Sequence, residues 1–218
     1  MAAPEKLTAT QVSDIDGLDD WRVLLRSLHS SFRSGSMAKG LELAGRIAAA
    51  ADAANHHPDL TITYPRVHVS LTTHETRSLT ARDVDLARTI SAIAAELEVP
   101  AEPVVATQLE IAIDALDIAA VRPFWEAVLG YRSDEDDEVV DPFGRGPAFW
   151  FQQMDEPRPQ RNRIHIDVTV PHDAAAERIE AALAAGGTLV SDASAPSFWV
   201  LADPEGNEAC ICTWQARD

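Results

Sequence analysis

Two prolines divide this chain of 218 residues. Pro100 and Pro103 stand in LEVPAEPVVATQ, residues 97–108, and interrupt the helical periodicity of the residues before them. Each half, of about 100 residues, is long enough to bury a hydrophobic core of its own. The sequence therefore predicts two domains, residues 1–103 and residues 104–218.

Composition and charge restrict the partners of such a protein. Apolar residues make up 46% of the chain, which is typical of a folded protein. The formal net charge of -17 would repel nucleic acid and anionic lipid. The N-terminus does not resemble a signal peptide, and no segment approaches the ~20 apolar residues of a membrane span. We therefore expect a cytoplasmic protein that binds neither nucleic acid nor membranes.

The cysteines fit the same cellular location. Cys210 and Cys212 are two residues apart, and on a strand they would stand at the limit of disulfide reach. We expect both to be reduced, as is usual in the cytosol.

Helix and strand patterns follow one another in the first half. A short helix is expected near residues 7–18, capped by Thr8 or Thr10. Residues 22–33 fit a helix and a strand equally well. A helix begins near Ser36 and must end at or just before His57, because a residue that precedes proline avoids the α conformation.

A strand and a second helix follow Pro58. Residues 67–73, VHVSLTT, alternate, with Val67, Val69 and Leu71 on one face. The next helix is expected over residues 80–97, TARDVDLARTISAIAAEL.

Four of the seven histidines lie within residues 55–74, NHHPDLTITYPRVHVSLTTH. His56 and His57 come where a helix must end, and the carbonyl groups there favour a protonated imidazole, which can act as a general acid. The alternative is that they only cap the helix. His68 and His74 are ~20 Å apart on one strand and cannot share a small site. His74, at the strand end, is the better candidate, and acid-base chemistry is favoured over a metal site.

Residues 51–90, ADAANHHPDLTITYPRVHVSLTTHETRSLTARDVDLARTI, closely resemble the pterin-4a-carbinolamine dehydratases. Their pattern is an acidic residue, His-His-Pro, a strand of the form V-H-V-x-L-x-T-H and a helix beginning L-T-x-x-D. The resemblance covers about residues 7–98. It implies an α+β fold in which helices cover one face of an antiparallel sheet, and it favours a strand for residues 22–33.

The resemblance also implies an activity. In that family, histidines eliminate water from 4a-hydroxytetrahydropterin to give quinonoid dihydropterin, without metal or organic cofactor, and members self-associate. We therefore expect a pterin substrate and a homo-oligomer, a dimer or larger. The implied catalytic residues are His56, His57 and His74, and the implied substrate-binding residues are Asp52, Pro58 and Asp83. We expect proton transfer by His56 and His74, and binding of the pterin by His57. Asp83 is expected near the rim of the pocket, but Thr80 to Asp83 also fits a capping box.

The sequence departs from the family pattern at several positions. Asp52 stands where a glutamate is usual, and Ser78 replaces a glycine, so the turn that carries His74 would be strained if that position required positive φ. Ser34 and Met37 replace aromatic residues.

The second half repeats one order of elements, strand, helix and strands. Three of its segments resemble the vicinal oxygen chelate superfamily, which includes the glyoxalases: LDIAAVRPFWEAVLGY, RIHIDVTV and VLADPEGNEACIC. The resemblance implies paired βαβββ modules around a cup.

Two interpretations of this cup stay open. Alignment by element gives Glu110, His165 and Cys210 as candidate ligands of a divalent metal. The other interpretation is a metal-free cup for a small molecule, lined by aromatic residues that could equally be core: Trp125, Trp150, Phe151, Trp199 and Trp214.

The sequence thus supports a pterin dehydratase fused to a glyoxalase-like domain. The alternatives are a metal-dependent enzyme of the second domain, or a non-catalytic small-molecule-binding protein, each with a degenerate pterin site.

Overall fold

The computed structural model describes residues 4–103, 106, 108–134, 138–157, 165–170, 172–213 and 215–216. It divides into two compact units, Met1–Gln108 and Leu109–Asp218. The boundary predicted between residues 103 and 104 lies five residues before this division. Each unit has its own hydrophobic core.

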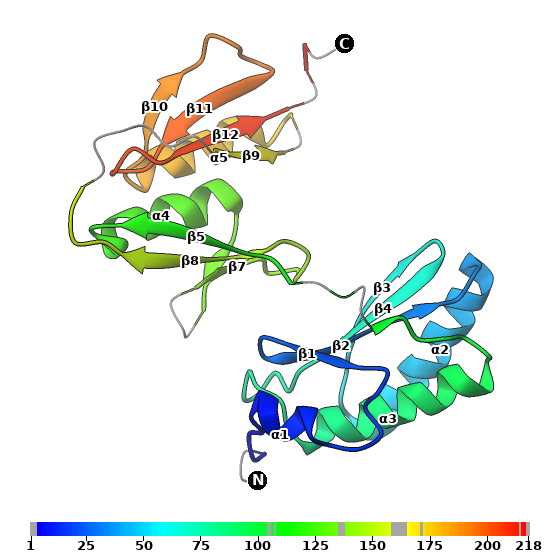
Figure 1. The fold of residues 1–218 in the computed structure, drawn as a ribbon. Helices are drawn as coiled ribbons and strands as arrows, with labels where there is room; N and C mark the ends of the chain where they lie inside the picture. Colours follow the sequence, from blue (N-terminus) through cyan, green and yellow to red (C-terminus); the bar gives the residue numbers. More distant parts are fainter. Residues whose placement is uncertain are drawn as a thin grey trace. The chain divides into compact units, whose positions relative to one another are not determined.

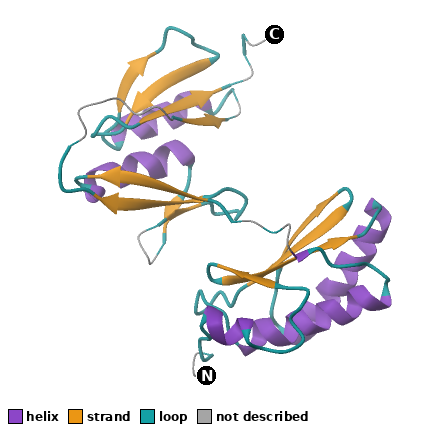
Figure 2. Cartoon of the chain, in the orientation of Figure 1, coloured by secondary structure: helices purple, strands orange, loops and turns teal. Residues whose placement is uncertain are grey.

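The first unit is an antiparallel sheet with helices on one face (Figures 1 and 2). The sheet has the order β1-β2-β4-β3. Its elements are α1 (Ala9–Ser13), β1 (Arg22–Leu24), β2 (Ser27–Arg33), α2 (Met37–Ala54), β3 (Asp59–Thr63), β4 (Arg66–Leu71) and α3 (Ala81–Glu96). The α+β class that the resemblance implied is confirmed.

The elements of the first unit agree with most of the local predictions and differ from them at β3. Residues 22–33 form a β-hairpin, not a helix, and Thr8 rather than Thr10 caps α1. Helix α2 ends at Ala54, three residues before His57, and the next residue, Asn55, adopts the left-handed conformation. Strand β3 was not predicted.

The core of the first unit explains which face the helices cover. Val67, Val69 and Leu71 of β4 are buried against apolar residues of α2 and α3, as the alternating pattern predicted. The helices contribute chiefly Leu43, Ile47, Leu86, Ala87 and Ile90. The opposite face of the sheet carries His29 and Ser31 of β2 with their partners Ser70 and His68 of β4.

The segment after α3 returns to this sheet. Ala101 forms a β-bridge with Phe32, and the Glu102 amide donates to the Ser31 carbonyl. The Glu102 carboxylate binds both Arg33 and Arg66, each at 2.7 Å. The hydrogen bond from Arg66, together with the charge of Arg33, lowers the pKa of Glu102. Residues 100–102 are therefore fixed to β2 and β4.

His29 of β2 gives the first unit a sensitivity to acid. Its Nε2 is buried and has no hydrogen-bond partner among the described residues. Burial lowers the pKa of His29 below its usual 6.5, so the unfolded chain binds more protons in this range. Stability should therefore fall as the pH decreases from about 6.5 through the lowered pKa. In His29→Gln the urea midpoint should depend less on pH between about 7.5 and 5.5. An unchanged dependence would contradict this assignment.

The second unit contains the same module twice. The first module consists of β5 (Glu110–Ala115), α4 (Ile118–Leu129), β6 (Arg132–Ser133), β7 (Val139–Val140) and β8 (Ala148–Gln153). The second consists of β9 (Ile166–Thr169), α5 (Ala175–Ala184), β10 (Thr188–Ser191), β11 (Phe198–Ala202) and β12 (Glu208–Cys212). The sheet orders, β5-β8-β7-β6 and β10-β11-β12-β9, are equivalent, because the first strand of each module pairs in parallel with its last strand. The predicted paired βαβββ modules are confirmed.

The two modules share one core. Phe124 and Trp125 of α4 are buried in the same cluster as Leu201 and Ile211 of the second module. Helices α4 and α5 pack together, and Arg178 of α5 donates to the Val128 carbonyl. Gly130 ends α4 at φ 70°, and a Cβ there would lie 2.4 Å from the Arg178 guanidinium. Glycine adopts this left-handed conformation without strain and leaves room for the Arg178 guanidinium.

The turn between β11 and β12 also joins the modules. The Glu205 carboxylate accepts hydrogen bonds from the Leu116 and Asp117 amides, just before α4. Asp203 is buried and accepts from Trp125 Nε1 at 3.0 Å. The D-P-E-G-N segment is thus more than a hairpin turn, because its carboxylates hold the first module.

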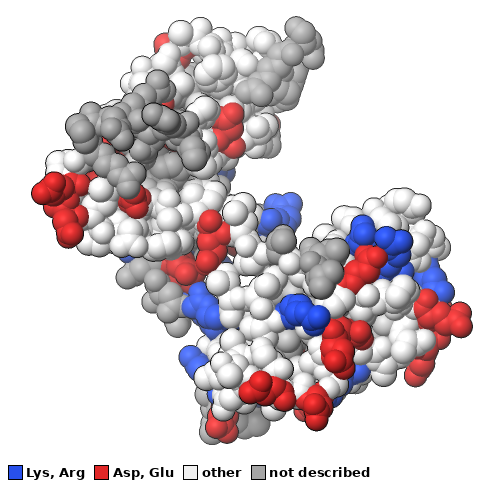
Figure 3. Space-filling view, viewed as in Figure 1, with Lys and Arg blue, Asp and Glu red and all other residues white. Residues whose placement is uncertain are grey.

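The surface of the first unit carries charges of both signs. Acidic and basic side chains are intermixed on the face of this unit that Figure 3 shows. Such a mixed face does not offer the continuous positive charge that a phosphate backbone requires. Among the helices of the described residues, none combines the length and the apolar character that a membrane span needs.

Candidate functional site

The candidate site is built around the end of α2. The left-handed Asn55 reverses the chain there, and the His56 amide donates to the Ala51 carbonyl. This reversal turns the His56 side chain inward, where it is 6% exposed. His57, the next residue, is exposed.

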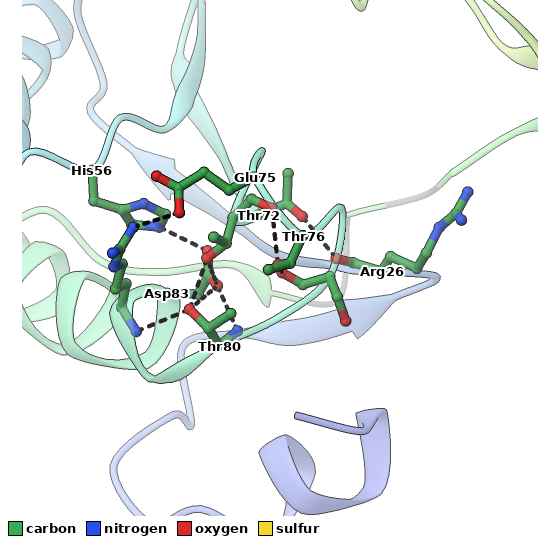
Figure 4. A network of polar contacts seen from close by, with 10 residues as sticks. Arg26, His56, Thr72, Glu75, Thr76, Thr80 and Asp83 are labelled. Atoms are coloured by element: carbon green, nitrogen blue, oxygen red, sulfur yellow. Dashed lines mark hydrogen bonds and ion pairs between the residues drawn. The ribbon is translucent and has the colours of Figure 1, made fainter. Parts of the chain in front are cut away.

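Asp83 is the centre of a buried polar network (Figure 4). One carboxylate oxygen lies 2.8 Å from His56 Nε2, and the other accepts the Thr80 amide and the Thr73 hydroxyl, each at 2.7 Å. Asp83 is fully buried, so the expectation that it lies near a pocket rim is wrong. The capping box with Thr80 is present, and the same carboxylate also holds His56.

This network determines what His56 can do. An ionised carboxylate only accepts hydrogen bonds, so His56 Nε2 carries the proton in this contact. In a neutral His56 the lone pair is then on Nδ1, which makes that atom the ring's proton acceptor. The Asp83 contact thereby fixes both the tautomer and the orientation of the ring.

The turn that carries His74 is attached to the same carboxylate. Thr73 binds Asp83 through its hydroxyl, and its amide donates to the Ser78 carbonyl. His74 follows directly and is exposed. The left-handed residue of this turn is Arg77, at φ 47°, and Ser78 is not in that region. The replacement of glycine by Ser78 therefore does not strain this turn.

His57 has a carboxylate partner of its own. Its Nε2 lies 3.1 Å from an Asp52 oxygen, and both side chains are more than half exposed. Aspartate, although one methylene shorter than glutamate, reaches His57 from the last turn of α2. Pro58 is half-buried and leads directly into β3.

Sequence reasoning missed two contributors to this region. Thr73 directly precedes His74 in the V-H-V-x-L-x-T-H motif, and this position in the motif could have indicated that it belongs to the site. Glu75, next to His74, forms an ion pair with Arg82 at 3.4 Å. No pattern in the sequence indicated this pair.

His68 lies outside the site, as predicted. It stands on the sheet face opposite the helices, with Ser31 and Thr61 as its strand neighbours. Burial, together with the charge of Arg66, lowers the pKa of His68.

A second cluster of titratable groups lies on the last sheet of the second unit. Ligand atoms of His165, Asp167 and Cys210 all lie within 4.8 Å of one another. Of the predicted set of Glu110, His165 and Cys210, the structure brings His165 and Cys210 together, and Glu110, on β5 in the other sheet, is not part of this cluster. Asp167 was missed, although its place two residues after His165 on a strand puts both on one face.

Both cysteines are free, as predicted. Burial, with the hydrogen bond to Asp167, raises the pKa of Cys210 to about 12. At neutral pH Cys210 is thus a thiol and not a ready nucleophile.

The aromatic residues proposed to line a cup are mostly core. Trp125 is 2% exposed and stacks on Phe149, and Phe151 and Trp199 pack against the same cluster. Trp150 is the exception, with 36% of its surface exposed. Trp214 lies outside the described residues. Core packing, one of the two interpretations of these aromatics, therefore holds for Trp125, Phe151 and Trp199.

Comparison with known proteins places both units. Residues 5–93 match the family model of the pterin 4 alpha carbinolamine dehydratases. A relative from Nostoc punctiforme is 35% identical over 88 residues, which are 40% of this chain and 95% of the relative. One from Thermomicrobium roseum is 36% identical over 86 residues, 39% of this chain and 92% of the relative. Both carry the name "Putative pterin-4-alpha-carbinolamine dehydratase".

Through its first unit, the chain belongs to the pterin-4a-carbinolamine dehydratase family. Residues 110–212 match the model of the glyoxalase-like domain.

Solved structures resemble each unit separately. A transcriptional coactivator/pterin dehydratase from Brucella melitensis is 30% identical and covers 41% of this chain and 99% of its own, with a TM-score of 0.39. A glyoxalase/bleomycin resistance protein/dioxygenase family enzyme from Burkholderia phytofirmans is 19% identical and covers 48% and 95%, with a TM-score of 0.37.

The departures from the pattern of the pterin-4a-carbinolamine dehydratases can now be placed. Ser34 is buried, and its hydroxyl donates to the carbonyls of Ser36 and Pro65, so it binds the β3–β4 turn to the start of α2. Met37 begins α2 and is 47% exposed. Neither residue belongs to the Asp83 network.

Proposed function

We propose that the first unit is a 4a-hydroxytetrahydropterin dehydratase, a hydro-lyase. The observation that carries the proposal is the Asp83 carboxylate, which binds His56 and Thr73 and so joins the two segments that hold His56, His57 and His74. Membership of the dehydratase family supports the choice of substrate.

The proposed reaction needs one proton donor and one acceptor. The C4a–O bond breaks, and the departing hydroxyl takes a proton from a histidine to leave as water. A second histidine accepts the proton of N5, and the N5–C4a double bond of quinonoid dihydropterin forms. Neither metal nor organic cofactor enters these steps.

We assign proton transfer to His56 and His74. Asp83 holds the Nε2 edge of His56, so Nδ1 is the atom that would exchange a proton with the pterin. His74 follows Thr73 and is exposed, and it would carry out the second proton transfer. His57, paired with Asp52, would bind and orient the pterin, and Pro58 would shape the chain between His57 and β3.

We also propose a cytoplasmic homo-oligomer. The two free cysteines support a reducing compartment. Met37 and Leu41, 47% and 59% exposed on α2, support self-association.

His74→Ala should lower kcat for dehydration of 4a-hydroxytetrahydropterin by tenfold or more, the order of magnitude of general acid-base catalysis. The measurement is the rate of quinonoid dihydropterin formation above the spontaneous reaction. His68→Ala is the matched control, since His68 lies on the opposite face of the sheet, and it should keep the wild-type rate. A wild-type protein with no rate above background would overturn the proposed function.

A further inference from the structure

All polar groups of Thr73 make hydrogen bonds inside the protein. The residue is 1% exposed, and its hydroxyl lies 2.7 Å from the Asp83 carboxylate and 2.7 Å from the Thr80 hydroxyl. Its amide donates to the Ser78 carbonyl, and its carbonyl accepts the Thr76 amide at 3.1 Å. These groups are therefore not available to a substrate.

The hydrogen bonds around Thr73 have one consistent direction. An ionised carboxylate only accepts, so the single hydroxyl proton of Thr73 lies toward Asp83. The contact between the two threonine hydroxyls then needs the proton of Thr80. The Thr80 hydroxyl in turn accepts the Arg82 amide at 3.2 Å, at the start of α3. The donors thus form a relay that ends on Asp83, whose negative charge is stabilised by the N-terminus of α3.

The relay joins two chain segments that the proposed reaction uses together. One Asp83 oxygen lies 2.8 Å from His56 Nε2, and the other binds Thr73, the residue before His74. A proton donor and a proton acceptor must reach the same pterin, so the separation of the two histidines matters. A misplacement of about 1 Å can cost on the order of 100-fold in rate.

We propose that Thr73 is a positioning residue of the dehydratase, which sets the separation of His56 and His74. It acts through Asp83 and does not touch the substrate. This inference rests on the proposed function of the first unit. It predicts a loss of kcat rather than a rise of KM, because pterin binding is assigned to His57, whose partner is Asp52.

Thr73→Val removes the hydroxyl and nearly keeps the size of the side chain. The protein should remain folded, because the Thr80 amide still binds Asp83 and the Thr80 hydroxyl, 3.3 Å from the same oxygen, can replace the lost donor. For dehydration of 4a-hydroxytetrahydropterin, kcat should fall roughly tenfold or more, while KM changes less than about threefold. Thr73→Ser keeps the hydroxyl and should retain kcat within about threefold of the wild type.

Thr72→Val is the matched control. Its hydroxyl donates to the Arg26 carbonyl at 3.1 Å, outside the Asp83 network, so this variant should keep the wild-type kcat. NMR of the histidine rings gives a readout without substrate. In Thr73→Val the His74 signals should shift, while the His56 ring should keep its proton on Nε2.

Three kinetic results would contradict the inference. They are a wild-type kcat in Thr73→Val, a kcat in Thr73→Ser as low as in Thr73→Val, and a raised KM with an unchanged kcat. A wild-type protein without activity would instead exclude the proposed function. The NMR comparison then decides separately whether Thr73 holds His74, because unchanged His74 signals in Thr73→Val would exclude such a role.

Discussion

Asp83→Asn should lower the dehydratase kcat at least tenfold while the protein remains folded. An asparagine that keeps its oxygen for the Thr80 amide and the Thr73 hydroxyl places its amide nitrogen opposite His56 Nε2. An amide donor opposite His56 Nε2 favours the other tautomer, with the proton on Nδ1, and so removes the acceptor that the reaction uses. The expected loss lies within the roughly 10²–10⁴-fold range of acid-base catalysis.

The same substitution should also cost stability. It removes the acceptor of His56 and takes the charge from the hydrogen bonds to the helix start and to Thr73, for which we expect about 1–3 kcal/mol in urea unfolding. Asp85→Asn, two residues later on the exposed side of α3, is the matched control and should change neither quantity. If kcat fell in parallel with the folded fraction alone, Asp83 would have no role in positioning His56.

Asp203→Ala should destabilise the second unit strongly. Asp203 accepts the indole N–H of Trp125, the Glu205 and Asn207 amides and the Asn207 side chain, at 2.8–3.0 Å. Alanine would leave a buried indole N–H without a partner and would open the turn. We expect a loss of about 2–4 kcal/mol, because each unsatisfied buried donor costs roughly 1–3 kcal/mol.

Tryptophan fluorescence can follow this unfolding, since four of the five tryptophans of the chain lie after residue 109. Asp192→Ala, an exposed aspartate of the same unit, should leave the denaturation midpoint unchanged. Trp125→Phe separates the two contributions, because it keeps a ring in the core and removes only the N–H. A stable Asp203→Ala protein would mean that water replaces the lost acceptor.

The sequence predicted best where a local rule had no competitor. Helix α2 ends before Pro58, Thr80 caps α3, and alternation places Val67, Val69 and Leu71 in the core. Residues 22–33 were ambiguous because both periodicities fit, and only the sheet partners β1 and β4 decide between them. Strand β3 was not predicted, although Leu60 and Ile62 alternate, because it has only five residues and directly follows Pro58.

The candidate sites were predicted less completely, since side-chain contacts join residues far apart in the chain. Asp83 was found, but its burial was not, because a capping residue is usually exposed and nothing local shows that His56 covers it. Asp167 was missed because it is a ligand candidate only beside Cys210, and that pairing depends on β9 and β12 being neighbours. Glu110 lies apart from this cluster, because alignment by element does not say which sheet a strand joins.

The carboxylate of Glu205 makes each of the two similar modules depend on the other. Glu205 belongs to the second module and accepts hydrogen bonds from the amides that precede α4 in the first module. A protein with only the first module would lack the acceptor for these amides. The two copies therefore depend on each other at this contact as well as through their shared core. A gene fragment that encodes a single copy should not yield a soluble domain, and recombination between homologues should succeed only where both copies are exchanged together.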